Sequence, residues 1–124
     1  NPFITEAWYN LGNSLKNLDK KEEAITSYSK AIGLKPEYAE AYNNLGNILN
    51  ELGKHEEAIK SLNKAIKLKP DLAEAYNNLG NSFRELSQLD LAAKYYSNAI
   101  NVKPNFSEAH YNYGIVHIHF LIIF

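Results

Sequence analysis

The chain has 124 residues, of which 45% are apolar and 22% are charged. This composition is typical of a globular protein, and the length fits one domain of ordinary size. Thirteen basic and fourteen acidic side chains give a net charge of −1, which argues against a strongly basic nucleic-acid-binding protein. Because there is no cysteine, the sequence excludes a disulfide framework, a thiolate zinc site and a cysteine nucleophile.

Two residue types recur at a fixed interval of 34 positions. The interval joins all four prolines, which are Pro2, Pro36, Pro70 and Pro104. It also joins four of the glycines, which are Gly12, Gly46, Gly80 and Gly114. A period of this length excludes a heptad coiled coil and indicates stacked supersecondary units.

Each unit has the pattern of two helices. Apolar residues three or four positions apart predict a first helix over 5–18 and a second over 21–34. Between them, Asp19 and Glu22 resemble a capping box, with Asp19 as the N-cap of the second helix. The same pattern predicts further helices over the ranges 39–52, 55–68, 73–86, 89–102 and from 107 onward. The predicted fold is therefore all-α, a stack of antiparallel helix hairpins.

Small residues occupy positions where these helices are expected to approach closely. Gly12, Ala24 and Ala31 have copies 34 and 68 residues later. A bulky side chain there would hold the helix axes apart.

The residues that recur every 34 positions resemble a known repeat signature. Trp8-x-x-Leu11-Gly12-x-x-Leu15, followed by Ala24, Tyr28, Ala31 and Pro36, is similar to the tetratricopeptide repeat. The resemblance implies an α-α superhelix with a concave groove lined by the first helix of each unit. It also implies protein or peptide binding rather than catalysis.

The resemblance also implies unit boundaries. Residues 1–4 are expected to close a preceding repeat, and three full repeats are expected at 5–38, 39–72 and 73–106. Residues 107–124 would then be the first helix of a partial fourth repeat, with an apolar C-terminal tail.

The resemblance places a set of mostly polar residues in the groove. We expect ligand contact from Tyr9, Asn10, Asn13, Asn43, Asn44, Asn47, Asn77, Asn78, Asn81, Arg84, Tyr111 and Asn112. An asparagine amide both donates and accepts, so it can pair with the backbone of an extended peptide. Asn10, Asn44, Asn78 and Asn112 are each 34 positions apart and would form a ladder along the groove floor. A similar asparagine ladder occurs in the superhelix of the O-linked N-acetylglucosamine transferases. Duplication of one unit would also explain the recurring asparagines, without any role in binding.

The expected groove charge is negative. Six carboxylates, Glu6, Glu40, Glu51, Glu74, Glu85 and Glu108, stand against the two cations Lys16 and Arg84, which gives −4. A neutral or basic segment should therefore be favoured. Family members that hold acidic chaperone C-termini use cations where this chain has Tyr9, Glu74 and Asn78, although Asn13 and Asn44 match. Because Glu74 would meet the ligand carboxylate without a compensating cation, binding of such tails is not expected.

Residues for catalysis or metal binding are not grouped in the sequence. The glycines never cluster into a phosphate-binding loop. His117 and His119 are two positions apart and point to different sides of a helix, while His110 and His117 share a face and are interpreted as packing residues. We therefore expect no enzyme activity, no metal, no cofactor and no nucleic-acid partner.

The C-terminal run from Ile115 to Phe124 is apolar and departs from the repeat. Its length of about ten residues falls short of the roughly 20 that span a bilayer, so no transmembrane segment is predicted. No signal peptide is visible, and a cytoplasmic location is expected. We expect a homodimer or higher homo-oligomer formed through Ile115, Ile118, Phe120, Leu121, Ile122 and Phe124. Contact with a membrane surface and aggregation of a truncated end are the alternatives.

The sequence thus favours a peptide-binding or protein-binding module. One alternative is a substrate-recruiting arm of a larger enzyme such as a glycosyltransferase. Another is a membrane-associated assembly factor.

Overall fold

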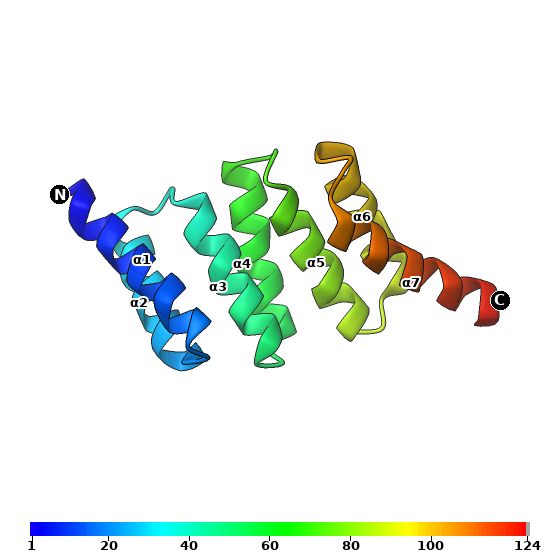
Figure 1. The fold of residues 1–124 in the computed structure, drawn as a ribbon, viewed down its shortest axis with the longest axis horizontal. Coiled ribbons are helices and arrows are strands. Elements are labelled where there is room, and N and C mark those ends of the chain that lie inside the picture. Colours follow the sequence, from blue (N-terminus) through cyan, green and yellow to red (C-terminus); the bar gives the residue numbers. More distant parts are fainter. Residues whose placement is uncertain (124) are drawn as a thin grey trace.

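The computed structural model describes residues 1–123, and over that range it contains helices and no strand. The helices are α1 (Pro2–Asn17), α2 (Lys21–Leu34), α3 (Ala39–Glu51), α4 (His55–Leu68), α5 (Ala73–Glu85), α6 (Leu89–Val102) and α7 (Ser107–Ile123). The all-α prediction is confirmed. The helices form an elongated array with the two termini at opposite ends (Figure 1).

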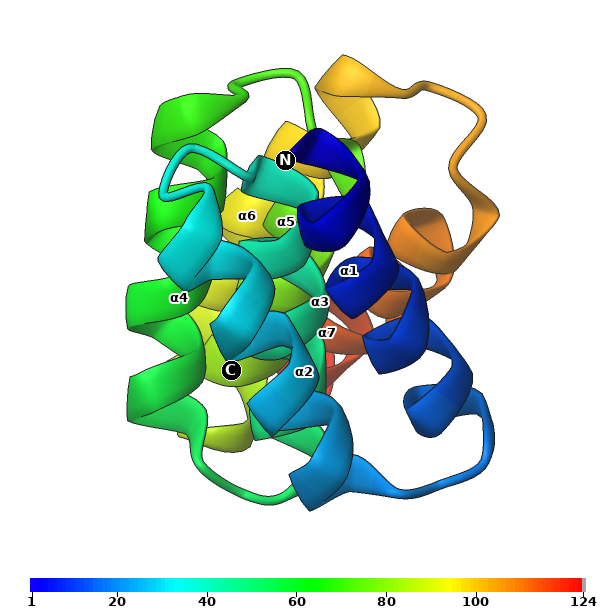
Figure 2. The same cartoon turned by 90° about the vertical axis from the view of Figure 1, so that its left-hand side faces the viewer.

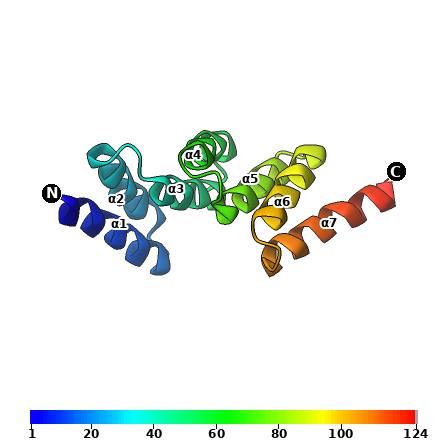
Figure 3. The same ribbon diagram turned by 90° about the horizontal axis from the view of Figure 1, so that it is seen from above.

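The array is an α-α superhelix of three hairpins and a seventh helix. Each hairpin packs α1 on α2, α3 on α4 or α5 on α6, and neighbouring hairpins meet through α2 with α3 and α4 with α5. The helices α1, α3, α5 and α7 also contact one another in that order. Viewed along the stack, α1 and α7 lie on one side and α4 on the opposite side (Figure 2). Seen from above, α4 again lies across the array from α1 and α7 (Figure 3).

The predicted close approach of the helices is confirmed. A Cβ atom added to Gly12 would lie 2.6 Å from Tyr28 Cε1, and one added to Gly46 would lie 2.5 Å from Leu62 Cγ. Gly80 meets the ring of Tyr96 in the same way. Gly114, in the same column, has no neighbour within 4 Å, because no described helix follows α7 to cover it. The glycines therefore let the two helices of each hairpin touch.

The first helix begins earlier than predicted. It starts at Pro2, and the Asn1 side chain caps it by accepting a hydrogen bond from the Phe3 backbone N–H at 2.9 Å. Proline suits the first helical position because its missing N–H would have no partner there. Residues 2–4 thus form the first turn of α1, ahead of the predicted helix start at residue 5.

The predicted capping box at Asp19 is wrong. Asp19 adopts a left-handed backbone conformation with a φ of 61° and ends α1 instead of starting α2. The Asp19 N–H donates to the Lys16 carbonyl at 3.0 Å, and the Lys20 N–H donates to the Leu15 carbonyl at 2.8 Å. This pair of bonds is a Schellman motif, in which the left-handed residue satisfies the last carbonyls of the helix.

Candidate functional site

Two neighbouring recesses lie along the side of the array formed by α1, α3, α5 and α7. The first has a volume of about 210 Å³ and is lined by Lys16, Asn43, Asn44, Asn47, Glu74, Asn77, Asn78, Phe106 and Glu108. The second has a volume of about 480 Å³ and is lined by Asn47, Asn50, Glu51, Gly53, His55, Asn81, Arg84 and Glu85. We call these two recesses together the groove. Asn47 borders both of them.

Asparagines connect adjacent repeats beneath this surface. The Asn44 side-chain amide donates from α3 to two groups on α1, the Tyr9 hydroxyl oxygen at 3.1 Å and Asn13 Oδ1 at 2.9 Å. These bonds join one repeat to the next.

The same connection returns at the next two junctions. Asn78 Nδ2 on α5 donates to Asn43 Oδ1 on α3 at 2.9 Å, and Asn112 Nδ2 on α7 donates to Asn77 Oδ1 on α5 at 3.1 Å. Each of these side-chain amides uses an N–H group for a hydrogen bond inside the protein. The recurring asparagine column therefore contributes to the stacking of the repeats.

Two buried tyrosines orient asparagines of the groove. The Tyr28 hydroxyl donates to Asn13 Oδ1 at 2.6 Å, and the Tyr96 hydroxyl donates to Asn81 Oδ1 at 2.6 Å. Burial raises the pKa of Tyr28 to about 12 and that of Tyr96 to about 12. Both phenols are therefore protonated donors at neutral pH. The repeat pattern alone did not predict this role, although each tyrosine follows its asparagine by 15 residues.

The predicted contact residues differ in accessibility. Asn43, Asn77 and Asn112 are only 8%, 2% and 7% exposed, and their positions support a structural role between helices. Half-buried positions are occupied by Tyr9, Asn13, Asn44, Asn47, Asn78, Asn81 and Arg84. Asn10 and Tyr111 are exposed but line neither recess. The surface that a ligand could reach is thus narrower than the sequence suggested.

Arg84 is the groove cation of the third repeat. Its guanidinium donates to Asn112 Oδ1 at 3.4 Å and lies 6.0 Å from the centre of the Tyr96 ring. It borders the larger recess, close to Glu51 and Glu85. The side chain is therefore held at the groove by α5 and α7 together.

The structure reduces the negative charge expected for the groove. Three of the counted carboxylates lie near lysines: Glu40 is 3.9 Å from Lys69, Glu74 is 3.8 Å from Lys103 and Glu51 is 3.8 Å from Lys21. Adding these three lysines to the residues counted from the sequence changes the expected net charge from −4 to −1. Glu74 therefore does have a neighbouring cation, contrary to the expectation. These side chains are partly exposed, so each pair contributes little to stability.

The apolar tail continues α7 beyond the stack (Figure 1). Ile115, Ile118, Leu121 and Ile122 are 39%, 56%, 70% and 79% exposed. Phe120, which was expected to serve self-association, is partly buried and packs with Val116 against α6. Phe124 lies outside the described residues.

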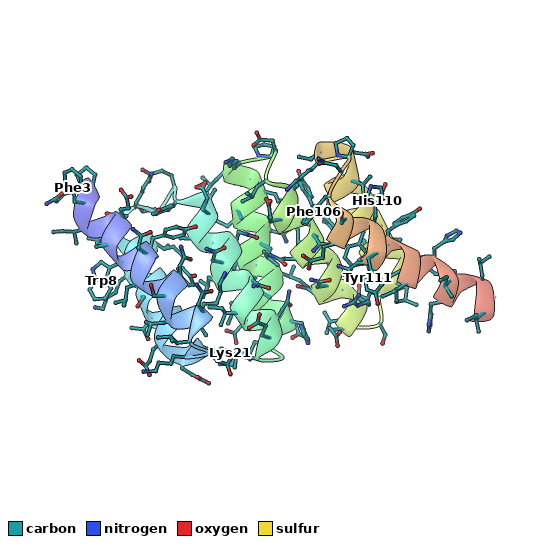
Figure 4. All side chains as sticks on the ribbon, in the orientation of Figure 1. Phe3, Trp8, Lys21, Phe106, His110 and Tyr111 are labelled. Atoms are coloured by element: carbon teal, nitrogen blue, oxygen red, sulfur yellow. The ribbon has the colours of Figure 1, made fainter. Side chains whose placement is uncertain are left out.

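The histidines of α7 lie on its surface and not in a core. His110 and Tyr111 both lie on the first half of α7, and Phe3 lies at the far end of the array (Figure 4). His110 Nε2 lies 2.7 Å from the Pro104 carbonyl oxygen, and the His117 ring stacks on Tyr113 with centroids 6.2 Å apart. Both histidines are exposed, because no described helix covers that side of α7. Their interpretation as packing residues is wrong.

The repeat pattern, the fold and the groove together define a class of protein. The family model "TPR repeat" matches residues 12–53 and 46–83, and the model "Tetratricopeptide repeat" matches residues 73–106. The chain therefore belongs to the tetratricopeptide repeat family. No curated protein matches it significantly. No helix within residues 1–123 has the length and hydrophobicity to cross a membrane.

Solved structures share the fold over nearly the whole chain. The first TPR of Spaghetti (RPAP3), bound to the HSP90 peptide SRMEEVD, is 23% identical with a TM-score of 0.92, and the match covers 98% of this chain and 96% of that one. The first TPR domain of human RPAP3 is 25% identical with a TM-score of 0.91, covering 94% and 92%. MamA is 29% identical with a TM-score of 0.87, covering 96% and 70%.

Proposed function

We propose that the chain is a protein-interaction module without enzyme activity, and that its groove holds an extended segment of a partner protein. The observation that carries the proposal is the groove itself, a polar surface to which α3 and α5 contribute several amides. A rigid scaffold that presents polar side chains in a recess is suited to recognition. The Spaghetti TPR, which has the same fold, is bound to a peptide.

The chemistry of the groove favours a neutral or basic segment. Among the residues that line the two recesses, Lys16 and Arg84 stand against Glu51, Glu74, Glu85 and Glu108, which gives a net charge of −2. An acidic C-terminus would meet Glu74 and Glu108 at the smaller recess, with Lys16 as the one cation among the residues that line it. We therefore propose that this chain differs in ligand from the TPR that binds the HSP90 peptide.

A synthetic peptide array tests this proposal. The array holds randomised peptides of about nine residues, roughly 30 Å when extended, with acetylated and amidated ends. We expect neutral and basic members to bind the protein and acidic members to bind more weakly, as measured by fluorescence anisotropy. The proposal fails if no member binds, and the charge preference fails if the tightest binders are acidic.

We further propose that the chain self-associates through the exposed side chains of α7. Ile118, Leu121 and Ile122 project beyond the stack, and burying them against a second copy would remove apolar surface from water. Val116 and Phe120 are a separate set, since they pack within the chain.

Substitution is a sharper test than truncation, because truncation would also remove Val116 and Phe120. We expect Ile118→Lys, Leu121→Lys and Ile122→Lys together to lower the mass measured by light scattering to that of a monomer. The circular dichroism spectrum should be unchanged. A mass that stays the same in the triple variant contradicts self-association through α7.

Two alternatives extend the same binding role. The sequence resemblance of the asparagine column to that of the O-linked N-acetylglucosamine transferases motivates a substrate-recruiting arm of a larger enzyme such as a glycosyltransferase. The exposed α7 side chains motivate an assembly factor at a membrane. Catalytic sequence in the flanking coding region would support the first, and liposome binding lost in the triple lysine variant would support the second. The cytoplasmic location expected from the sequence remains part of the proposal.

A further inference from the structure

His55 is a groove residue that comes from a second helix. It is the first residue of α4, is half-buried and lines the larger recess, whose other lining residues belong to α3, α5 and the turn between α3 and α4. The equivalent positions of the other two repeats hold Lys21 and Leu89. Of these three side chains, only the imidazole can accept a hydrogen bond. The larger recess therefore contains an acceptor that the neighbouring repeats lack.

The hydrogen bonds of Asn50 determine which ring nitrogen of His55 accepts. Asn50 Nδ2 donates to the Asn78 backbone carbonyl at 3.0 Å, which fixes the orientation of the amide. Asn50 Oδ1 accepts from Ser82 Oγ at 2.8 Å and lies 3.0 Å from His55 Nδ1. Because an amide oxygen cannot donate, Nδ1 carries the proton, and Nε2 of the neutral ring is an acceptor. Within residues 1–123 no group donates to this Nε2.

Two carboxylates line the same recess, and one of them has no ion-pair partner. Glu51 lies 3.8 Å from Lys21, whereas Glu85 is exposed and forms no ion pair within the described part of the chain. Arg84 also lines the recess, but its guanidinium donates to Asn112 on α7. Two carboxylates and one guanidinium give the lining of this recess a net charge of −1.

We propose that the larger recess binds an arginine side chain of the bound segment, with Glu85 and His55 Nε2 as its acceptors. A guanidinium presents five N–H donors in a planar fork, so it can donate to a carboxylate and an imidazole at the same time. The volume of about 480 Å³ is above the roughly 300 Å³ at which ligand pockets begin, so a long side chain fits. This inference rests on the proposed function and names the side chain that the groove selects.

A peptide series tests the choice of side chain. The probe is the tightest-binding peptide of the array, with each of its arginines replaced in turn by citrulline, which keeps the shape and removes the charge. At one position we expect about tenfold weaker binding, because hydrogen bonds from charged donors are the stronger ones. Lysine at that position should restore only part of the affinity. A probe without arginine, or one in which citrulline or lysine binds as tightly as arginine at every position, overturns the proposal.

Two variants test whether the arginine lies in this recess. His55→Leu removes the acceptor and introduces the residue that the third repeat has at this position, Leu89. Glu85→Gln removes the charge of an exposed side chain and should not affect folding. Each variant should weaken binding of the arginine probe by about three- to tenfold and leave binding of the citrulline probe unchanged. Glu57→Gln, on the exposed surface of α4, is the matched control and should change neither affinity.

The proposed function and the arginine recess can fail separately. A wild type that binds no array peptide overturns the proposed function itself. If the wild type binds, but Glu85→Gln binds the arginine probe equally tightly or weakens both probes to the same extent, only the arginine recess is overturned. The same holds for His55→Leu when its circular dichroism spectrum matches that of the wild type, and Glu85→Gln decides the question if His55→Leu does not fold.

Discussion

At the scale of single residues, identical columns of the repeat have different environments. Gly80 and Gly114 stand at the same repeat position, but only Gly80 meets an aromatic ring. Tyr28, Leu62 and Tyr96 share another column, and the hydroxyl is missing only from the middle one. The repeat pattern therefore predicts where a side chain lies better than it predicts what that side chain does.

The two glycines allow a direct comparison of packing with helix propensity. We expect Gly80→Ala to lower the free energy of unfolding by about 1–3 kcal/mol, because the new methyl group must displace Tyr96. Gly114→Ala should raise it by up to about 1 kcal/mol, because alanine is the better helix former and nothing lies nearby. Urea unfolding followed by circular dichroism measures both. Equal effects of the two substitutions would contradict the packing described for the hairpins.

The buried tyrosines predict a loss of stability at alkaline pH. Burial raises the pKa of Tyr28 and Tyr96 from 10.0 to about 12, so the folded state holds two protons that the unfolded state releases between those values. The contribution of the two tyrosines to the free energy of unfolding is complete below pH 10. It decreases as the pH rises toward 12, by up to about 3 kcal/mol for each tyrosine.

A phenylalanine variant is the control for this prediction. Tyr28→Phe with Tyr96→Phe should flatten the decline of unfolding free energy between pH 10 and 12. It should also lower stability at neutral pH by about 1 kcal/mol for each hydroxyl removed, because Asn13 and Asn81 lose a donor. An unchanged alkaline slope in this variant would show that other groups cause it.

At the scale of the helices, the 34-residue spacing predicted most boundaries well. The helices α2, α4 and α6 begin and end at the predicted residues, and α3 and α5 end one residue early. The spacing is sufficient to predict these helix boundaries because the same two features recur in each unit. A residue with a left-handed backbone conformation follows the first helix, and a proline follows the second. Asp19 was misassigned because aspartate is common both at N-caps and in left-handed positions.

The groove was less predictable than the helices. The equivalent positions of the repeats identified the residues of the groove. The hydrogen bonds between repeats also depend on the directions of the side chains, which the spacing of residues does not give. Asn44 and Asn47 come from adjacent turns of α3, yet Asn44 donates to α1 while the Asn47 side chain has no hydrogen-bond partner among the described residues. The available signal was the tyrosine found 15 residues after Asn13 and Asn81 but not after Asn47.

The ends of the first helices provide another prediction. Ser87 and Gly53 both end their helices in the left-handed region, with φ values of 61° and 78°. A side chain costs about 1–2 kcal/mol in that conformation. We therefore expect Ser87→Gly to raise the melting temperature and Gly53→Ala to lower it. If the melting temperatures of both variants shift in the same direction, the left-handed backbone conformation does not explain how these two residues affect stability.

At the scale of the whole molecule, stacking creates the groove and also leaves the ends uncovered. Within residues 1–123 each repeat contacts only its neighbours, so the groove is built jointly by α1, α3, α5 and α7 and belongs to no single unit. At the C-terminal end, no described helix packs on the outer side of α7, which exposes isoleucine and leucine. Binding and self-association are thus proposed for different surfaces, and they can be tested separately.

NMR titration of the labelled protein with the tightest-binding array peptide distinguishes the inner surface from the outer one. Side-chain amide resonances report each asparagine individually. We predict that the Asn47 amide shifts strongly, along with backbone resonances of α3 and α5 that line the groove. Asn63 on α4 should not move. Shifts confined to α2, α4 and α6, with the Asn47 amide unchanged, would contradict peptide binding in the groove.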